Sequence, residues 1–160
     1  MNKVPVKRFI PGLILVFVLI QLIRPSRTNP PVIPSRSLEA HVQVPTAVQT
    51  VLQRSCYDCH SNATVWPWYS NVAPVSWYVI RDVNVARGHI NFQDFEAQAN
   101  PAEAKEHLGL ICKLVQRGSM PPADYRLMHK GTDLSPSEIS SVCAWSHTFG
   151  SGEDNDKKPD

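Results

Sequence analysis

Three kinds of pattern are missing from this 160-residue chain, and each absence excludes a class of protein. No segment alternates apolar and polar residues as a half-buried β-strand does, and no unit of sequence is repeated along the chain. No cluster of Lys and Arg marks a nucleic-acid-binding face, because residues 46–150 carry eight basic and nine acidic residues. We therefore expect an all-α fold and no nucleic-acid partner.

Acidic residues are scarce at the N-terminal end, where residues 1–45 carry six Lys or Arg and Glu39 as the single acid. Three of these cations precede an apolar run from Phe9 to Ile23, the order found in a secretory signal. Because no small-x-small cleavage site follows, we expect residues 1–23 to remain as a signal anchor and single transmembrane segment. The run is nevertheless shorter than the ~20 residues that a spanning helix usually needs. Positive charge before the run predicts a cytoplasmic N-terminus, with the remainder on the other side.

Composition divides the rest of the chain into three parts. Residues 24–45 contain five prolines and little apolar periodicity, which predicts an extended, semi-rigid linker. Residues 46–150 are enough for one small domain. Residues 151–160 are polar and charged, which predicts a disordered tail.

Cysteine is also scarce, and two of the four cysteines stand in the run Cys56-Tyr57-Asp58-Cys59-His60. Cysteines at positions i and i+3, followed at once by histidine, form the attachment signature of c-type haem. On one helical turn each thiol can add to one haem vinyl group, and the histidine can bind the iron as proximal ligand. A redox disulfide and half of a zinc site are the alternatives. We expect one covalent haem c, attached through Cys56 and Cys59 and ligated by His60.

Four helices are expected between residues 46 and 150, each with apolar residues at helical spacing. Gly118 is expected to end the third of them. Their starts are marked by a capping residue, by prolines in the first turn and by a capping box, at Thr46, Pro74, Pro101 and Ser135 with Glu138. A covalently attached haem would give these helices an apolar centre to pack around.

The order of motifs between residues 21 and 149 resembles a haem-binding domain family of bacterial, membrane-anchored proteins related to small c-type cytochromes. The matching pieces are Gln21-Leu22-Ile23-Arg24-Pro25, Asn29-Pro30-Pro31, Cys56 to Asn62, Trp66-Pro67-Trp68-Tyr69-Ser70, Ala73-Pro74-Val75-Ser76-Trp77, Asp82-Val83, Asn91-Phe92, Met120-Pro121-Pro122, Tyr125, His129, Leu134-Ser135 and Trp145. The resemblance implies a small cytochrome c-like helical domain around a covalent haem. It also implies one-electron transfer with redox partner proteins that it does not identify. With the charge pattern, it places the chain in a bacterial inner membrane, single-pass, with the haem domain in the periplasm.

The resemblance implies a sixth iron ligand on a loop before the last helix, and Met120 is the candidate. Pro121 and Pro122 force an extended chain there, which can present the Met120 side chain to a haem. The main rival is His129, in the same inter-helix region. The weaker rivals are Met128, His107 and His89.

Other residues have both a functional and a structural interpretation. The aromatic cluster after the haem motif can hydrogen-bond haem propionates or simply form the core and pocket wall; its members are Trp66, Trp68, Tyr69 and Trp77. Arg81 and Arg87 can pair with propionates or lie on solvated helix faces. Cys112 and Cys143 can form a disulfide between the third and last helices or remain two buried thiols.

The sequence thus predicts a membrane-tethered monohaem c-type cytochrome-like protein that carries one electron outside the cytoplasm. We expect the protein to act as an electron carrier more than as a catalyst. A haem peroxidase, or a gas or redox sensor with an open distal iron site, is one alternative. A haem that serves only as a structural element is the other.

Overall fold

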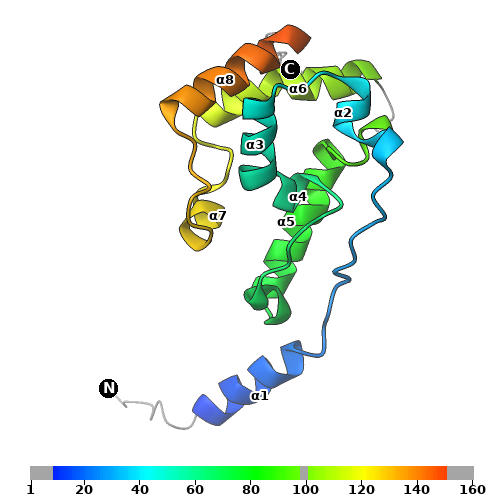
Figure 1. Cartoon of the computed structure of the whole chain (residues 1–160). Helices are drawn as coiled ribbons and strands as arrows, with labels where there is room; N and C mark the ends of the chain where they lie inside the picture. Colours follow the sequence, from blue (N-terminus) through cyan, green and yellow to red (C-terminus); the bar gives the residue numbers. More distant parts are fainter. Residues whose placement is uncertain (1–8, 98–100, 151–160) are drawn as a thin grey trace, which may run out of the picture.

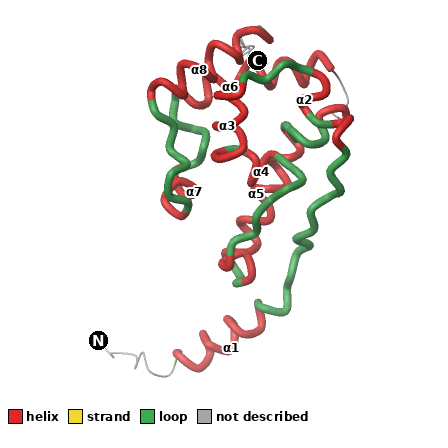
Figure 2. The backbone as a smooth tube through the Cα atoms, in the orientation of Figure 1, coloured by secondary structure: helices red, strands yellow, loops and turns green. Residues whose placement is uncertain are grey.

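The computed structural model describes residues 9–97 and 101–150, and every regular element in them is helical (Figures 1 and 2). This confirms the predicted all-α class. The elements, with 3₁₀ helices marked η, are α1 (Ile10–Ile20), η2 (Pro34–Arg36), α2 (Leu38–His41), α3 (Thr46–Ser55), α4 (Tyr57–His60), η3 (Trp68–Asn71), α5 (Val75–His89), η4 (Phe95–Ala97), α6 (Pro101–Gln116), α7 (Ala123–Met128), α8 (Pro136–Ser146) and η5 (His147–Phe149).

The core lies where α6 packs against α8 and α8 packs against α3 (Figure 1). Each helix contributes apolar side chains that are almost fully buried, including Leu52 of α3, Leu108 of α6 and Val142 of α8. Trp145 of α8 is also buried, and its indole N–H donates to the Gln43 carbonyl at 3.0 Å. The first part of the domain is thereby fastened to its last helix.

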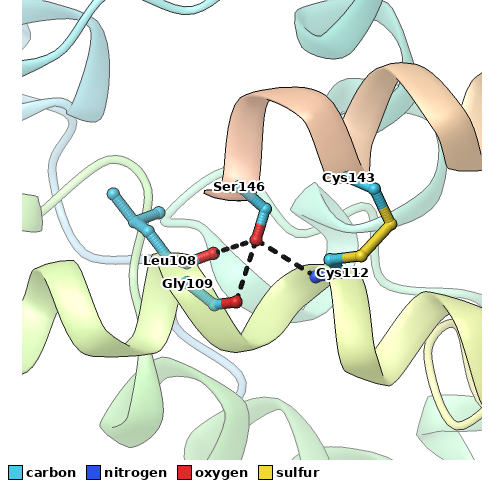
Figure 3. The surroundings of a disulfide bond; sticks show 5 residues. All are labelled: Leu108, Gly109, Cys112, Cys143 and Ser146. Carbon is cyan, nitrogen blue, oxygen red and sulfur yellow. Dashed lines mark hydrogen bonds between the residues drawn. A yellow bond between two sulfur atoms is a disulfide. The ribbon is translucent and has the colours of Figure 1, made fainter. Parts of the chain in front are cut away.

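A disulfide between Cys112 of α6 and Cys143 of α8 joins these two helices covalently. Ser146, fully buried one turn later, adds a polar fastening (Figure 3). Its hydroxyl donates to the Leu108 and Gly109 carbonyls at 2.7 and 3.1 Å and accepts from the Cys112 N–H. Cys112 and Cys143, whose state the sequence left open, are therefore paired in this structure, and they cannot supply the other half of a zinc site.

Helix starts follow the sequence signals with two corrections. Pro74 precedes α5 as its N-cap residue and does not lie in its first turn. The capping box is present at α8, where the Ser135 hydroxyl accepts from the Glu138 N–H and the Glu138 carboxylate accepts from the Ser135 N–H. Gly118 follows α6 with φ +67°, the left-handed conformation that ends helices. Thr46, however, is the first residue of α3 and not its cap, because Pro45 precedes the helix in an extended conformation and no side chain caps it.

Helix α1 projects from the rest of the molecule and meets it only at its C-terminal end (Figure 1). Its large apolar side chains are exposed except for the partly buried Ile20 at its end; Leu13, for example, is 68% exposed. With 11 residues, α1 measures about 16 Å. In the described part of the chain, no helix combines the length and apolar character needed to cross a bilayer. The predicted transmembrane segment is therefore not supported by the described helices; its residues 1–8 lie outside the description, as does the tail at residues 151–160.

The proline-rich segment differs along its length. Residues 24–33 contain no helix, whereas residues 34–45 include η2 and α2. Leu38, which the sequence placed in the linker, is completely buried in the domain core. Its N–H donates to the Phe92 carbonyl at 2.7 Å. The packed domain therefore includes residues well before Thr46.

Candidate functional site

The cysteine motif lies where α3 ends and α4 begins. Cys56 separates the two helices, and α4 is a single turn. The Cys56 carbonyl accepts from the Cys59 N–H at 3.1 Å and from the His60 N–H at 2.9 Å. The two thiols therefore stand one helical turn apart, and the imidazole of His60 follows directly after the second of them.

Both thiols are free and partly buried. Burial raises the pKa of Cys56 to about 12 and that of Cys59 to about 11, and neighbouring carboxylates, first Asp58, add to the shift at Cys59. Both side chains are therefore protonated thiols at neutral pH. Reactive cysteines usually have a lowered pKa, which favours the thiolate, so the raised pKa values of Cys56 and Cys59 do not favour a thioredoxin-like redox pair.

The imidazole of His60 has a defined tautomer. Its Nδ1 lies 3.0 Å from the Ile90 carbonyl, and because a carbonyl only accepts, Nδ1 carries the proton. Burial lowers the pKa of His60, which keeps the ring neutral. Nε2 therefore keeps its lone pair, which is the arrangement found in histidines that bind a metal through Nε2 and donate Nδ1–H to a backbone carbonyl.

Phe92 forms a wall beside this histidine. Its fully buried ring lies 5.9 Å from the His60 ring and stacks on Tyr57 at 5.4 Å. Its N–H donates to the His60 carbonyl at 2.8 Å. Ring packing and the backbone bond together hold α4 against the segment that follows α5. Phe92 was one of the residues that carry the family resemblance, but no pattern in the sequence predicted that its ring would pack beside His60.

Asp58, between the two cysteines, joins α4 to α7. One carboxylate oxygen accepts from the Tyr125 hydroxyl at 2.8 Å and the other from the Val65 N–H at 3.2 Å. Burial and this hydrogen bond raise the pKa of Tyr125, so the phenol stays a donor. Helix α7, which the sequence did not predict, is thereby brought next to the cysteine motif.

His129 reaches the same region through α7. Its ring stacks on Tyr125 at 4.1 Å, and its Nδ1 donates to the Tyr125 carbonyl at 3.0 Å. The Tyr69 hydroxyl lies 3.4 Å from its Nε2. The structure thus associates two predicted site residues, Tyr69 and His129, with the α7 face of the motif.

Met120 lies in the turn between α6 and α7, half-buried, and its N–H donates to the Leu114 carbonyl at 3.3 Å. Its peptide bond to Pro121 is cis. Met128 is largely exposed at the end of α7. His89 and His107 form an edge-on pair with ring centroids 6.3 Å apart. Within the described residues, no three His, Cys, Asp or Glu side chains come together as a metal site.

The other predicted aromatic residues are distributed around the N-terminal segment. The Trp66 indole N–H donates to the Asn29 side chain at 3.2 Å, and that of Trp77 donates to the Ile23 carbonyl at 2.8 Å. Trp68 is 75% exposed. Two indole N–H groups considered for haem propionates thus have backbone or amide partners here.

Arg87 has a larger structural role than its place on a helix surface indicated. Its guanidinium donates to the Ser61 carbonyl at 2.7 Å, and to Asn29 Oδ1 and Thr64 Oγ1 at 2.8 Å each. A weaker bond reaches the Thr28 carbonyl at 3.4 Å. Burial lowers the pKa of Arg87, but the side chain remains cationic. Arg81, by contrast, is exposed on the same helix.

A model of the family described as the haem-binding domain matches residues 15–148. This covers most of the chain, which therefore belongs to the haem-binding domain family and is a haem-binding protein. No curated protein and no solved structure matches it.

Proposed function

We propose that Cys56 and Cys59 hold one haem covalently through thioether bonds, and that His60 binds its iron through Nε2. The observation that carries this proposal is the tautomer of His60. The Nδ1–H bond to Ile90 leaves the lone pair of the ring on Nε2, directly after two thiols that stand one helical turn apart. This donor set fits a c-type haem.

A bound haem iron supplies one-electron chemistry by alternating between Fe(II) and Fe(III). This chain's residues position and shield the site. Phe92 and Tyr57 place stacked rings beside His60. The proposed role is therefore electron transfer between redox partner proteins, with no substrate transformed.

For the sixth coordination position we propose Met120, with His129 as the competing ligand. The turn that contains Met120 directly precedes α7, which Tyr125 ties to Asp58 of the cysteine motif. A thioether favours Fe(II) and would raise the reduction potential relative to a second histidine.

We also propose that the apolar N-terminal segment holds the protein at a bacterial inner membrane, with the haem domain on the periplasmic side. The exposed apolar surface of α1 and the three cations before it support this location.

Attachment is tested with the full chain expressed alongside a cytochrome c maturation system. Wild type should keep its haem through acidic, denaturing extraction, whereas Cys56→Ala with Cys59→Ala should release it. The matched control, Cys112→Ala with Cys143→Ala, removes as many cysteines and should keep the haem attached. Haem retained by the Cys56 and Cys59 double variant after denaturation would refute thioether attachment.

The sixth ligand is tested on the same preparations by absorption spectroscopy, redox titration and carbon monoxide binding. Met120→Ala should remove the sulfur-to-iron charge-transfer band, lower the potential and open the iron to carbon monoxide. The control Met128→Ala, in an exposed position of α7, should behave as wild type. If His129→Ala opens the iron and Met120→Ala is silent, the haem has two histidine ligands.

A further inference from the structure

Residues 21–31, called the strap below, connect α1 to the domain through specific hydrogen bonds. The Gln21 side chain pairs with the backbone of Ala73: its Nε2 donates to the carbonyl at 3.1 Å and its Oε1 accepts from the N–H at 2.9 Å. Two residues later, the Ile23 carbonyl accepts from the Trp77 indole. The C-terminal end of α1 is therefore fastened to the start of α5.

The fastening continues along the strap. Arg27 donates to the Ser70 hydroxyl at 3.1 Å, and Asn29 donates to the Thr64 carbonyl at 2.9 Å while accepting from Arg87. The Pro31 carbonyl accepts from the Asn62 side chain at 3.1 Å. Because these bonds extend over 11 residues, the strap is not a flexible linker between α1 and the domain. Its direction is set by the domain.

The end of the domain that carries these bonds is apolar and basic. In Figure 1, η3 and the start of α5 face the end of α1. Trp68 of η3 is 75% exposed and Val75 of α5 is 46% exposed. Arg24 and Arg27 are exposed on the strap. Neither residues 9–38 nor residues 59–81 contain an Asp or Glu. The first carboxylates beyond this end are Asp124 of α7, to which the Tyr78 hydroxyl donates, and Asp82 of α5.

We propose that this end of the haem domain, formed by η3, the first turn of α5 and the strap, rests on the lipid headgroups of the membrane into which α1 inserts. Exposed aromatic and aliphatic side chains beside arginines, without carboxylates, suit an anionic lipid interface. The inference rests on the membrane location proposed above and adds a defined orientation. His60 bonds Ile90 at the opposite end of α5, so the motif is held about 20 Å along that helix from the lipid.

The test uses the full chain in vesicles of phosphatidylcholine and phosphatidylglycerol, with a fluorophore on one introduced cysteine. All four native cysteines are occupied, by haem in the proposal and by the disulfide in the structure, so the label is unique. Val75→Cys labels the proposed contact, and Ser140→Cys labels the exposed surface of α8 as control. Emission is compared between vesicles with and without lipids brominated near the carboxyl end of the acyl chains. This ratio cancels any quenching by haem.

Bromine should reduce emission at Val75→Cys by about twofold and leave Ser140→Cys unchanged, as expected for an interfacial contact. Adding Gln21→Ala should reduce the quenching at Val75→Cys while the protein still sediments with vesicles. The control variant Ser26→Ala, which loses a hydrogen bond to Thr28 inside the strap, should keep the quenching.

Three results would overturn the inference. If the protein sediments with vesicles but both labels are equally insensitive to bromine, the membrane location stands and the orientation is wrong. A Val75→Cys label that is protected from iodide but insensitive to bromine would show that a second copy covers this end. If the protein does not sediment with vesicles, the proposed membrane location itself fails, while haem attachment is measured independently.

Discussion

Arg87 is the residue outside the cysteine motif whose loss should be most damaging to the site. It links three parts of the chain: α5 itself, the loop after α4 and the strap. Replacing it by alanine removes all of its bonds and leaves the Ser61 carbonyl, at the end of the haem motif, without its guanidinium donor. Ser61 is fully buried, so water has little access to take over that role.

The magnitude follows from the three short bonds, at 2.7, 2.8 and 2.8 Å. A hydrogen bond to a charged group contributes about 1.5–3 kcal/mol, but three bonds of one half-exposed group are not additive, because water partly replaces them. We therefore expect Arg87→Ala to lower the free energy of unfolding by about 3 kcal/mol, a large part of the ~5–15 kcal/mol of a typical domain.

Urea unfolding followed by circular dichroism at pH 7 measures this change. Arg81→Ala is the matched control, because Arg81 lies on the same helix, 74% exposed, with a long 3.7 Å ion pair to its neighbour Asp82. It should cost less than ~0.5 kcal/mol. Arg87→Lys should recover only part of the loss, since an ammonium cannot reproduce the planar donor set. Equal stability of the Arg87→Ala and Arg81→Ala variants would refute the view that the network supports the domain.

Two further predictions concern α8. The disulfide closes a loop with a sequence separation of 31, so replacing both Cys112 and Cys143 by alanine should cost about 3–4 kcal/mol in urea unfolding; an unchanged midpoint would contradict this. Glu138 has its pKa lowered to about 2, chiefly by the hydrogen bond from Arg54 and then by those from Ser135. A lowered carboxyl pKa stabilises the folded state at pH values above the ordinary pKa of glutamate, and this stabilisation is lost as the pH falls toward 2. Glu138→Gln should therefore lower the free energy of unfolding by about 1 kcal/mol at pH 7 and by almost nothing near pH 2. A cost independent of pH would show that the charge is not responsible.

The parts of the fold that the sequence predicted are those with local signals. The capping box at Ser135 and the glycine after α6 are decided by residues a few positions apart, and both are present. Leu38 was missed because a single apolar residue among prolines has no periodicity, although the Phe92 carbonyl 54 positions later accepts from its N–H. Helix α7 was missed for a related reason: its six residues are too few for a helical pattern.

The candidate site divides in the same way. The spacing of Cys56, Cys59 and His60 was readable because one helical turn brings them together. The tautomer of His60 was not, since it depends on a carbonyl 30 residues away. Nor could the sequence distinguish Arg87 from Arg81, because only the fold brings Asn29, 58 residues earlier, to one of them. Long-range polar contacts have no sequence period, so propensity and spacing cannot reveal them.

These long-range contacts also explain why the haem motif and the N-terminal segment belong to one structural unit. The residue after His60 is Ser61, whose carbonyl accepts from Arg87, and Arg87 in turn holds Asn29 of the strap. Next along the chain, Asn62 donates to the Pro31 carbonyl and accepts from Asn91, which precedes the Phe92 wall. The strap is therefore connected to the residues around His60 through hydrogen-bonded side chains. A change in the strap should thus be detectable at the histidine, which a domain on a free linker would not allow.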